Sequence, residues 1–600
     1  MDSPARAPQR NPQAEYQRRM EELRAAEVVY KSRDDRLAYT ILLLIISAIA
    51  VAIWLLFSKS SLYWAGIPLA VFIFFAVIHS RVLRALRDCR RAIAFYERGL
   101  ARLNNRWIGT GQNGERFLDS KHPYARDLDI FGSGSVFELL CTARTCAGEQ
   151  MLASWLLTPA IPEEVLLRQA AVNEMRDRLR FREELAVLSE GIDAAGRPDA
   201  FTAWGESGEI PAPKYLRILL PLLAAIWATS LVGWIGWGFW YAAVGISAIN
   251  ALIASRLSKR YGPHALAIEN AVHDVQFISE VLERMEKEPF SSSKLSALQR
   301  ALSRGEHSAS ERVARLARLT DSLRSRRSYL VALLNPFIFW SAQFVLAIHA
   351  WRRSSGSEIR GWLAALGEME ALSDLAGYSY EHPHDIFPEF TNESPCYEAE
   401  GLAHPLMPES SAVRNDLVLG RELRVVIISG PNMAGKSTFV RAVGVNAVLA
   451  QCGAPVRAKR LRISRLAIAA SVCVLDSLQG GISRFYAEIT RLKLIMDMAQ
   501  KPTPVLFLLD ELLSGTNSHD RRVGAEALVR ALFQRNAVGL VTTHDLSLAE
   551  IAKLLGDRVA NAHFEDHLDD GKLRFDYRLT PGVVQTSNAL ELMRSIGLDV

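Results

Sequence analysis

The chain has 600 residues, of which 49% are hydrophobic and 22% are charged, and its formal net charge is +5. This length predicts several domains. The net charge is too small to indicate a nucleic-acid partner by itself. The six cysteines form no CxxC pair, which is typical of a reduced cytoplasmic protein and predicts no cysteine-bound metal.

The first apolar region consists of two uncharged runs, residues 37–57 and 62–78, separated by a short serine-rich turn. Each run has about the length that a helix needs to cross a bilayer. Tyr63 and Trp64 lie at the ends of the runs, as in an interfacial aromatic belt. No small-residue cleavage site accompanies the first run, which indicates an anchor rather than a cleaved signal. We expect a transmembrane hairpin here.

A second pair of apolar runs, residues 218–233 and 238–254, is joined near Trp234 to Trp237 and predicts a second hairpin. Because the segments are short and contain glycine, hairpins buried in a protein core are the alternative. Arginine and lysine flank the open ends of both hairpins, whereas the connecting turns hold only Lys59. The positive-inside rule then predicts a multi-pass protein of the cytoplasmic (inner) membrane with both termini in the cytoplasm.

A further apolar region, Tyr329–Ala350, contains Asn335, Gln343 and His349, which are costly groups inside a bilayer. A single extra crossing would also place the C-terminal part of the chain on the opposite side of the membrane. We therefore expect a buried helix pair that is broken at Pro336.

Charged helical patterns surround the second hairpin and predict a helical core. Its arginine-rich stretch, residues 300–327, could contact DNA phosphates. A solvated helix face is the favoured alternative, because charges at helical spacing usually face water.

A glycine-containing loop follows the apolar run Val425–Ile428 and precedes a helical stretch, Phe439–Ala450. Strand, loop and helix in this order are the setting of a phosphate-binding P-loop. Its glycines let backbone N–H groups turn toward phosphate oxygens, and the helix N-terminus favours the same negative charge. Lys436 would reach the β- and γ-phosphates of ATP, and the Ser437 hydroxyl would bind Mg²⁺. The expected nucleotide-binding residues are Gly430, Pro431, Asn432, Met433, Ala434, Gly435, Lys436, Ser437 and Thr438.

Two later apolar runs end in polar residues that suit an ATPase. Residues 504–509 predict a central strand buried on both faces, directly before Asp510 and Glu511. Asp510 would hold the Mg²⁺ shell, and Glu511 would orient or deprotonate the attacking water. A capping pair after a buried strand is the alternative. The run Val538–Thr542 precedes His544, which could sense the γ-phosphate or simply finish a loop.

Three stretches, GPNMAGKST at 430–438, DELLSGTNSHDR at 510–521 and THD at 543–545, together resemble the ATPase domain of the MutS mismatch-repair family, a branch of the ABC-type ATPases. The resemblance implies a homodimer around two ATP molecules. It identifies Ser483 as the residue that reaches the γ-phosphate in the partner subunit, and Thr516–Asp520 as a loop facing that subunit. Weaker similarity covers residues 131–145, 152–159, 401–406, 415–416 and 588–592.

The chain departs from the family pattern at two positions. Ala434 replaces the usual second glycine of the loop, which is compatible with a negative φ. Arg484 stands where the family usually has a small hydroxyl residue, so the site shared between subunits would differ at that point.

The sequence indicates no counterpart of the domain with which members of this family read mismatches. Family members that recognise mismatches stack a phenylalanine on the mispaired base from an N-terminal α/β domain. The triplet Phe95-Tyr96-Glu97 lies instead in a basic helical stretch, where we expect an exposed helix face, and the segment before it is too short for that domain. The second hairpin falls near the place of the family's DNA clamp, so we expect a membrane anchor to replace the clamp.

The expected fold is multidomain: an α-helical MutS-like core with two transmembrane helical hairpins, followed by an α/β P-loop ATPase domain. Its parts are a basic N-terminal segment (1–36), the first hairpin (37–79), the first part of the core (80–216), the second hairpin (217–255), the second part of the core (256–390) and the ATPase domain (391–600). The expected function is an ATPase that couples hydrolysis to binding of duplex or branched DNA. The alternative is a mechanochemical ATPase that acts on a membrane or protein partner without DNA.

Overall fold

A computed structural model describes most of the chain, and its residues group into two compact units. The described residues are 11–58, 66–192, 198–208, 213, 215–272, 275–303, 306–431, 433–472, 484–513, 516–544, 546–569 and 572–584. The first unit comprises Met1–Thr142, Leu152–Arg182 and Ala371–Val600, and the second comprises Ala143–Met151 and Glu183–Glu370. The prediction of a multidomain, mostly helical chain with an α/β region near its C-terminus is confirmed.

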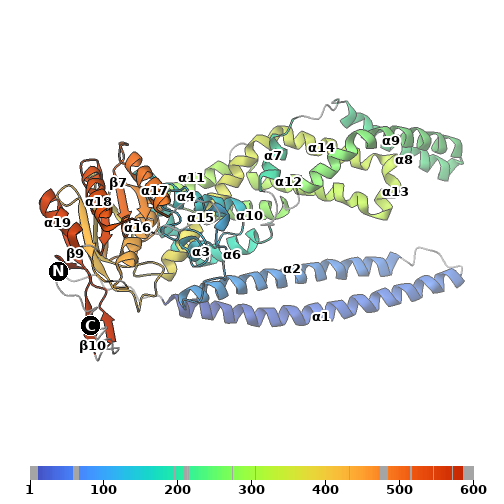
Figure 1. Ribbon diagram of the computed structural model, residues 1–600. Coiled ribbons are helices and arrows are strands. Elements are labelled where there is room, and N and C mark those ends of the chain that lie inside the picture. The colour runs from blue at the N-terminus through green and yellow to red at the C-terminus, as the bar shows by residue number, and fades with distance from the viewer. Residues whose placement is uncertain are drawn as a thin grey trace. The chain divides into compact units, whose positions relative to one another are not determined.

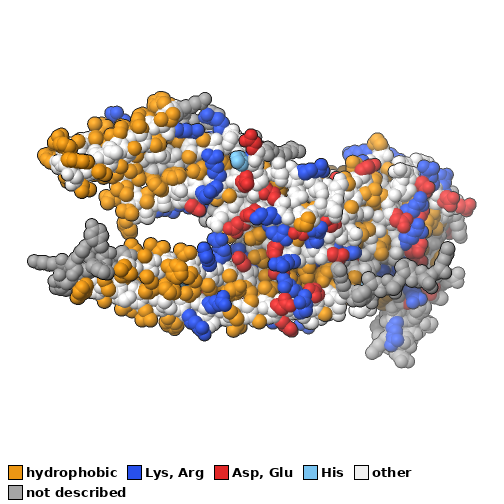
Figure 2. Space-filling view, turned by 180° about the vertical axis from the view of Figure 1, so that it is seen from behind, with side chains coloured by type: hydrophobic (Ala, Val, Ile, Leu, Met, Phe, Trp, Pro, Cys, Tyr) orange, Lys and Arg blue, Asp and Glu red, His pale blue; other side chains and the backbone are white. Residues whose placement is uncertain are grey.

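The first unit begins with two long helices, α1 (Pro12–Ser58) and α2 (Gly66–Leu103), which pack against each other along their length (Figure 1). Figure 2 shows hydrophobic side chains over one end of this pair and charged side chains toward the other. Among the exposed apolar residues, Leu43 is 67% exposed and Phe74 is 62% exposed. The predicted helical hairpin is therefore present, and its apolar half is exposed within its own unit.

The charged half of the helix pair is fixed to the rest of the first unit by a buried ion pair. Arg102 of α2 donates two hydrogen bonds of 2.6 Å to Glu381, whose side chain is fully buried. Glu381 also accepts a hydrogen bond of 3.2 Å from Tyr16 of α1. A buried carboxylate needs such partners, since desolvation penalises an unpaired charge.

The triplet Phe95-Tyr96-Glu97 lies in α2, as expected, but the expectation of an exposed face is wrong for its two aromatic residues. Phe95 and Tyr96 are buried, and the Tyr96 ring packs edge-on against Tyr16 of α1, with the ring centroids 5.4 Å apart. The two rings serve the helix–helix contact. Only Glu97 faces solvent, where it pairs with Arg24 at 2.9 Å.

A six-stranded, mostly parallel sheet forms the centre of the C-terminal part of the first unit. Its strand order is β12-β9-β4-β8-β7-β6, and only β12 runs antiparallel to its neighbour. The strands are β4 (Val425–Ser429), β6 (Ala467–Ser471), β7 (Val505–Leu509), β8 (Ala537–Thr543), β9 (Val559–His563) and β12 (Thr580–Pro581). Every residue of β4, β7 and β8 is buried, which confirms the prediction of a central strand at 504–509.

Helices cover both faces of this sheet. Residues of α17 (Arg484–Met498), α18 (Ser518–Phe533) and α19 (Leu546–Leu555) share one apolar cluster with Phe507 and Val541 of the sheet. On the other face lies α16 (Lys436–Cys452), where a side chain at Gly444 would meet Leu508. The helix predicted at 439–450 is therefore confirmed, and it begins at Lys436.

Two smaller sheets accompany the large one and were not predicted. A four-stranded sheet has the order β1-β5-β2-β3, and β10 pairs with β11 in a hairpin. These strands are β1 (Glu389–Phe390), β2 (Tyr397–Leu402), β3 (Asn415–Leu419), β5 (Arg460–Ile463), β10 (Asp566–Asp569) and β11 (Lys572–Phe575). The four-stranded sheet positions residues 401–416 beside the P-loop, as described below.

The remaining helices of the N-terminal 206 residues are short. They are η2 (Glu115–Phe117), α3 (Val136–Leu140), α4 (Cys146–Leu157), α5 (Pro162–Arg176), α6 (Leu179–Ser189) and α7 (Pro198–Glu206). The similarity to the MutS core around residues 131–159 falls on α3 and α4, whose side chains are mostly buried. They serve packing, as apolar residues at helical spacing usually do.

The second unit contains a second hairpin of apolar helices, α8 (Leu216–Trp237) and α9 (Trp240–Ala271), which pack against each other (Figure 1). Both are longer than their predicted runs. The turn lies at Gly238, which has a φ of 77° and ends α8 directly after the expected junction near Trp234 to Trp237. Apolar residues of α8 remain uncovered within this unit, as shown by Ile235, which is 86% exposed.

The helices that follow α9 are α10 (Val275–Lys287), α11 (Ser293–Leu302), α12 (Ala309–Arg324), η3 (Ser325–Arg327), α13 (Tyr329–Ile338), α14 (Trp340–Ser355), η4 (Gly356–Glu358) and α15 (Ile359–Glu381). All belong to the second unit except the last part of α15, which belongs to the first unit from Ala371 on. Among the described residues, three helical segments are long and apolar enough to cross a membrane: Ile67–Leu103, Leu216–Trp237 and Trp240–Glu269. The bent pair α13–α14 would be a fourth if it counted as one span.

The expectation of a buried helix pair broken at Pro336 is wrong in two respects. Pro336 lies inside α13, and the break comes at Phe339, which adopts a left-handed φ of 55°. No residue of α13 is buried, and Leu333 is 70% exposed. The two helices meet at 79°. Only α14 carries a buried face, which includes Val345 and Leu346.

Candidate nucleotide site

The loop between β4 and α16 has the backbone that a phosphate-binding turn requires. Gly430 has a φ of 144°, and a Cβ atom there would lie 2.7 Å from the carbonyl oxygen of Phe564, so only glycine fits. Gly435 and Met433 also have positive φ, 101° and 67°. Ala434 does not, which confirms that alanine is compatible with this position. Asn432 lies outside the described residues.

Lys436 begins α16 and turns back over this loop. Its Nζ donates hydrogen bonds to the carbonyl oxygens of Gly430, at 2.8 Å, and Pro431, at 2.7 Å. Burial lowers the pKa of Lys436, and the nearby carboxylates of Glu511 and Asp510 oppose this shift. An ammonium group in this position faces the space where phosphate oxygens would bind, and low local dielectric strengthens its attraction for them.

One hydroxyl group contacts both residues that follow β7: the side chain of Asp510 and the backbone of Glu511. Thr542 of β8 donates a hydrogen bond from Oγ1 to Asp510 Oδ1, and the same Oγ1 accepts one of 3.1 Å from the backbone N–H of Glu511. Glu511 adopts a left-handed φ of 50°. Its Oε1 lies 2.7 Å from Nε2 of His544. The Asp510 side chain is thus oriented toward Thr542, and the Glu511 side chain is oriented toward His544.

His544 connects the two halves of the site. Its Nε2 lies 3.3 Å from Nζ of Lys436, in addition to its contact with Glu511. Parallel pairing explains this convergence, since β4, β7 and β8 end at the same edge of the sheet, with Ser429 opposite Thr543 and Leu509 opposite Val541. The structure therefore brings together Lys436, Asp510, Glu511 and His544. Their chemical roles stay predictions.

A cavity of about 570 Å³ opens beside the loop. Ser437 and Thr438 line it with exposed side chains. The other lining residues are Leu402, Ala403, His404, Met407, Ser411, Val413, Asn415, Met433, Gly435, Lys436, Phe439, Ala442, Glu511, Phe564 and Tyr577. A lining that combines polar and apolar groups suits a phosphorylated nucleotide with a planar base.

The two upstream segments with family similarity meet at this cavity. The backbone N–H of Gly401 donates a hydrogen bond of 2.6 Å to Asp416, while Leu402, His404 and Asn415 line the wall. Burial, with a smaller contribution from the nearby arginines, lowers the pKa of His404 to about 4. His404 is therefore neutral at neutral pH, and its Nδ1 accepts a hydrogen bond of 3.2 Å from Leu406.

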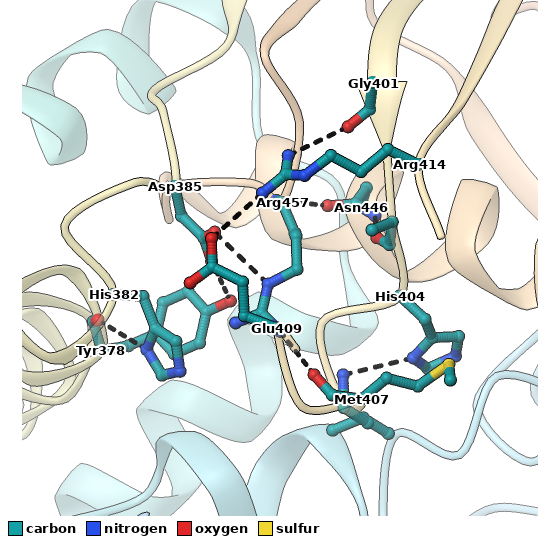
Figure 3. A network of polar contacts seen from close by, with 12 residues as sticks. Tyr378, His382, Asp385, Gly401, His404, Met407, Glu409, Arg414, Asn446 and Arg457 are labelled. Carbon is teal, nitrogen blue, oxygen red and sulfur yellow. Dashed lines mark hydrogen bonds and ion pairs between the residues drawn. The ribbon is translucent and has the colours of Figure 1, made fainter. Parts of the chain in front are cut away.

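A polar network supports this wall from behind (Figure 3). Arg457 is its centre: it donates to Asp385 at 3.3 Å and to the carbonyl oxygen of Met407 at 2.6 Å, and its backbone N–H donates to Asn446 at 2.8 Å. Asp385 also accepts a hydrogen bond of 2.6 Å from Tyr378. The network fixes the loop that carries Met407 into the cavity.

Sequence reasoning missed several residues of the site. Thr542 stands inside a predicted strand, where nothing distinguishes it from a core threonine, and Arg457 and Tyr577 lie far from any motif. Tyr577 is held by Asn415, which donates to its carbonyl oxygen at 3.0 Å.

Several predicted residues cannot be placed in the site. Ser483 and the segment around residues 588–592 lie outside the described residues. Within Thr516–Asp520, the Asn517 side chain caps α18 by accepting a hydrogen bond of 2.9 Å from the backbone N–H of Asp520. That local role explains the asparagine without reference to a partner subunit.

The residues present fit Mg²⁺, the ion that such a loop implies. Mg²⁺ prefers oxygen ligands, commonly one or two carboxylates together with phosphate and water oxygens. The Ser437 hydroxyl faces the cavity, and the Asp510 carboxylate lies at the end of β7 with one oxygen engaged by Thr542. A hydroxyl and a carboxylate are the donor set that the ion requires.

The strand order, the loop and the two carboxylates define a P-loop ATPase domain of the parallel-sheet type. Comparison with known proteins identifies its family. Residues 426–599 match MutS domain V, and these matches place the ATPase domain of this chain in the MutS family.

Individual relatives agree with this assignment. The DNA mismatch repair protein MutS of Thermus thermophilus is 32% identical over 255 residues, which cover 42% of this chain and 30% of the relative. The DNA mismatch repair protein MutS 2 of Halobacterium salinarum is 34% identical over 39% of this chain and 27% of its own length. The endonuclease MutS2 of Thermus thermophilus is 34% identical over 34% of this chain and 26% of its own length. The matched part of the chain thus spans less than a third of each of these relatives.

We predict that Thr542→Val slows ATP turnover by about ten- to a hundredfold, because the loss of one buried hydrogen-bond partner costs about 1–3 kcal/mol. The variant should need more Mg²⁺ for half-maximal turnover, since Asp510 loses its orientation. Steady-state hydrolysis across a Mg²⁺ series measures both effects. Thr542→Ser keeps the hydroxyl and is the control. Equal turnover of the valine variant and the wild type would contradict the role assigned to Thr542.

Proposed function

We propose that this chain is a membrane-anchored ATPase of the MutS type that hydrolyses ATP as a dimer and couples hydrolysis to DNA binding. The observation that carries the enzymatic part is the convergence of Lys436, Asp510, Glu511 and His544 beside a nucleotide-sized cavity. The DNA mismatch repair and endonuclease names of the relatives support the DNA part.

The proposed reaction is in-line attack of water on the γ-phosphorus, which breaks its bond to the oxygen that bridges to the β-phosphate. Glu511 orients the water and accepts its proton, and His544 holds the Glu511 carboxylate at 2.7 Å. Lys436 exchanges the carbonyl oxygens of Gly430 and Pro431 for phosphate oxygens and neutralises their charge. When bound, Mg²⁺ supplies further neutralisation of the phosphates.

The dimer is proposed from the family resemblance. By that likeness Ser483 contacts the γ-phosphate of the partner subunit, and Arg484, which begins α17, alters the neighbouring position. The arrangement would make hydrolysis depend on subunit contact, so the ATPase rate per subunit should rise with protein concentration.

We predict that Glu511→Gln retains ATP binding and loses turnover, because the amide keeps the size of the side chain but cannot accept the proton. Binding of a fluorescent ATP analogue and steady-state phosphate release measure the two properties separately. Glu526→Gln is the matched control, since Glu526 lies on α18 and pairs with Arg530 away from the site. Full activity in Glu511→Gln would refute the assignment of the base.

The membrane part of the proposal is supported by uncovered apolar helices. Leu43 and Phe74 of the first hairpin and Ile235 of the second are exposed within their own units. A buried core hairpin would cover such side chains, because about 25 cal/mol is gained for each Å² of apolar surface removed from water. Lipid hydrocarbon would remove the same surface from water.

We predict that the protein fractionates with membranes, resists extraction by high salt or carbonate, and exposes residues 234–237 on the side opposite the ATPase domain. Glycosylation tags or protease protection at this turn, compared with tags at the C-terminus, map the two sides. Finding the turn on the cytoplasmic side would refute the hairpin topology.

A second function, mechanical action on a membrane or protein partner without DNA, is favoured by one observation. Many arginines that could meet DNA phosphates in residues 300–327 are paired with carboxylates. Arg312 contacts Glu358 at 2.6 Å, and Arg326 and Arg327 contact Glu269 at 3.1 and 2.6 Å. Paired guanidinium groups are less available to phosphates.

The two functions predict different responses to DNA. A DNA-coupled ATPase should bind duplex or branched DNA with an affinity that falls steeply with salt, and its hydrolysis rate should rise when DNA is added. Titration of the purified protein with labelled DNA at several salt concentrations, together with ATPase assays, tests both responses. Absence of both would favour the mechanical function.

A further inference from the structure

The helix α13 is apolar except for Asn335, and its first turns are exposed. It contains Tyr329, which is 97% exposed, and Leu330 and Leu333, which are 68% and 70% exposed. Within its own unit it packs against α8 and α9. An apolar surface of this kind is unfavourable in water and continues the uncovered apolar surface of the second hairpin.

The break between α13 and α14 has side-chain partners for its backbone polar groups. The Asn335 side chain accepts a hydrogen bond of 2.9 Å from the backbone N–H of Ser341, and Gln343 donates one of 2.7 Å to the carbonyl oxygen of Ile338. Asn250 of α9 donates one of 2.9 Å to the carbonyl oxygen of Phe337. In water such groups need no protein partner, whereas in hydrocarbon they require one.

Contacts with α8 show how far along this proposed membrane span the break between α13 and α14 lies. The Phe337 ring stacks on Trp227 with centroids 5.2 Å apart and an angle of 7°, and Asn250 also donates to Leu223 at 3.4 Å. Leu223 and Trp227 follow Leu216, the first residue of α8, by distances of about 10 and 16 Å along the helix at 1.5 Å per residue. The break therefore lies well inside the proposed span.

Both ends of the α13–α14 segment lie beside the open end of the α8–α9 hairpin. Arg217, at the beginning of α8, donates a hydrogen bond of 3.3 Å to the carbonyl oxygen of Leu346 in α14. Arg326 and Arg327 precede α13 and pair with Glu269 near the end of α9, while Arg352 and Arg353 follow in the last turn of α14. Basic residues thus flank both ends of the segment, as expected when both ends lie on the cytoplasmic side.

We propose that α13 and the first turns of α14 form a re-entrant membrane loop, which enters the hydrocarbon beside α8 and α9 and leaves on the side from which it came. The proposal rests on the membrane anchoring proposed above. Lipid acyl chains are the partner of the α13 surface, because that surface is continuous with the apolar face of the hairpin and is bounded by arginines at its open ends. Such a loop adds membrane contact without changing the side on which the ATPase domain lies.

The depth of α13 can be measured with nitroxide spin labels. Single cysteines at Leu333, Ile249 and Val28 would be labelled in a full-length protein whose native cysteines are replaced, reconstituted in vesicles of phosphatidylethanolamine and phosphatidylglycerol. Ile249 is an exposed position of α9, and Val28 is an exposed position in the charged half of α1. The accessibilities to oxygen and to a water-soluble nickel chelate distinguish hydrocarbon from water. Retained ATPase activity shows that each labelled protein is folded.

We expect the labels at Leu333 and Ile249 to favour oxygen, and the label at Val28 to favour the nickel chelate. A Leu333 label that favours the nickel chelate, beside an Ile249 label that favours oxygen, would overturn the re-entrant loop and leave the anchor intact. If both labels favour the nickel chelate, the membrane proposal itself fails.

A second measurement distinguishes a re-entrant loop from a complete crossing. His307, before α13, and Ser357, after α14, are exposed positions, and each would be replaced by a single cysteine. A membrane-impermeant maleimide should modify both from the side of the ATPase domain. Modification of the two positions from opposite sides would show a complete span and overturn the proposal.

Discussion

The parallel register of the central strands is the constraint on which the rest of the ATPase domain depends. Ser429 pairs with Thr543, and Leu509 pairs with Val541, so the strands β4, β8 and β7 end at one edge of the sheet. Asp510 and His544 directly follow β7 and β8, and Lys436 follows the loop after β4. These residues therefore meet, although more than a hundred positions separate Lys436 from His544. A shift of one residue would move every side chain of a strand to the opposite face, where it would meet a different set of helix side chains, so packing on both faces fixes the register.

The cavity depends on a second set of contacts that lie outside the parallel sheet. The four-stranded sheet positions Leu402 and His404 in the cavity wall. Arg457 holds that wall in place through hydrogen bonds to Asp385 and to the carbonyl oxygen of Met407. Because these groups are buried, each needs its partner, and the loss of one would leave another polar group unsatisfied. The nucleotide site is therefore made by two layers of structure: a parallel sheet that supplies the chemistry and a mixed sheet that supplies the shape.

The local parts of this architecture could be predicted from the sequence, and the long-range parts could not. The loop at Gly430, the strand before Asp510 and the apolar helices all follow from residue order and hydrophobic pattern. The strand β1 has two residues and pairs with β5 more than seventy positions later, so it carries no local signal. The break of the apolar region was expected at Pro336 but lies at Phe339, where Asn335, Gln343 and the distant Asn250 hold the backbone. The hydroxyl of Thr542 joins Asp510 and Glu511 only because two strands are neighbours.

The buried contact of Arg102 and Tyr16 with Glu381 has a mechanical consequence. Glu381 ends α15, and Tyr378, one turn earlier, donates to Asp385 in the network behind the nucleotide cavity. The same helix end therefore contacts the base of the long helix pair and is connected to the cavity wall through Asp385 and Arg457. The helix α1 has 47 residues and is about 70 Å long, so a tilt of about five degrees at its base would displace its tip by about 6 Å. A small rearrangement of the cavity wall would be amplified by this lever.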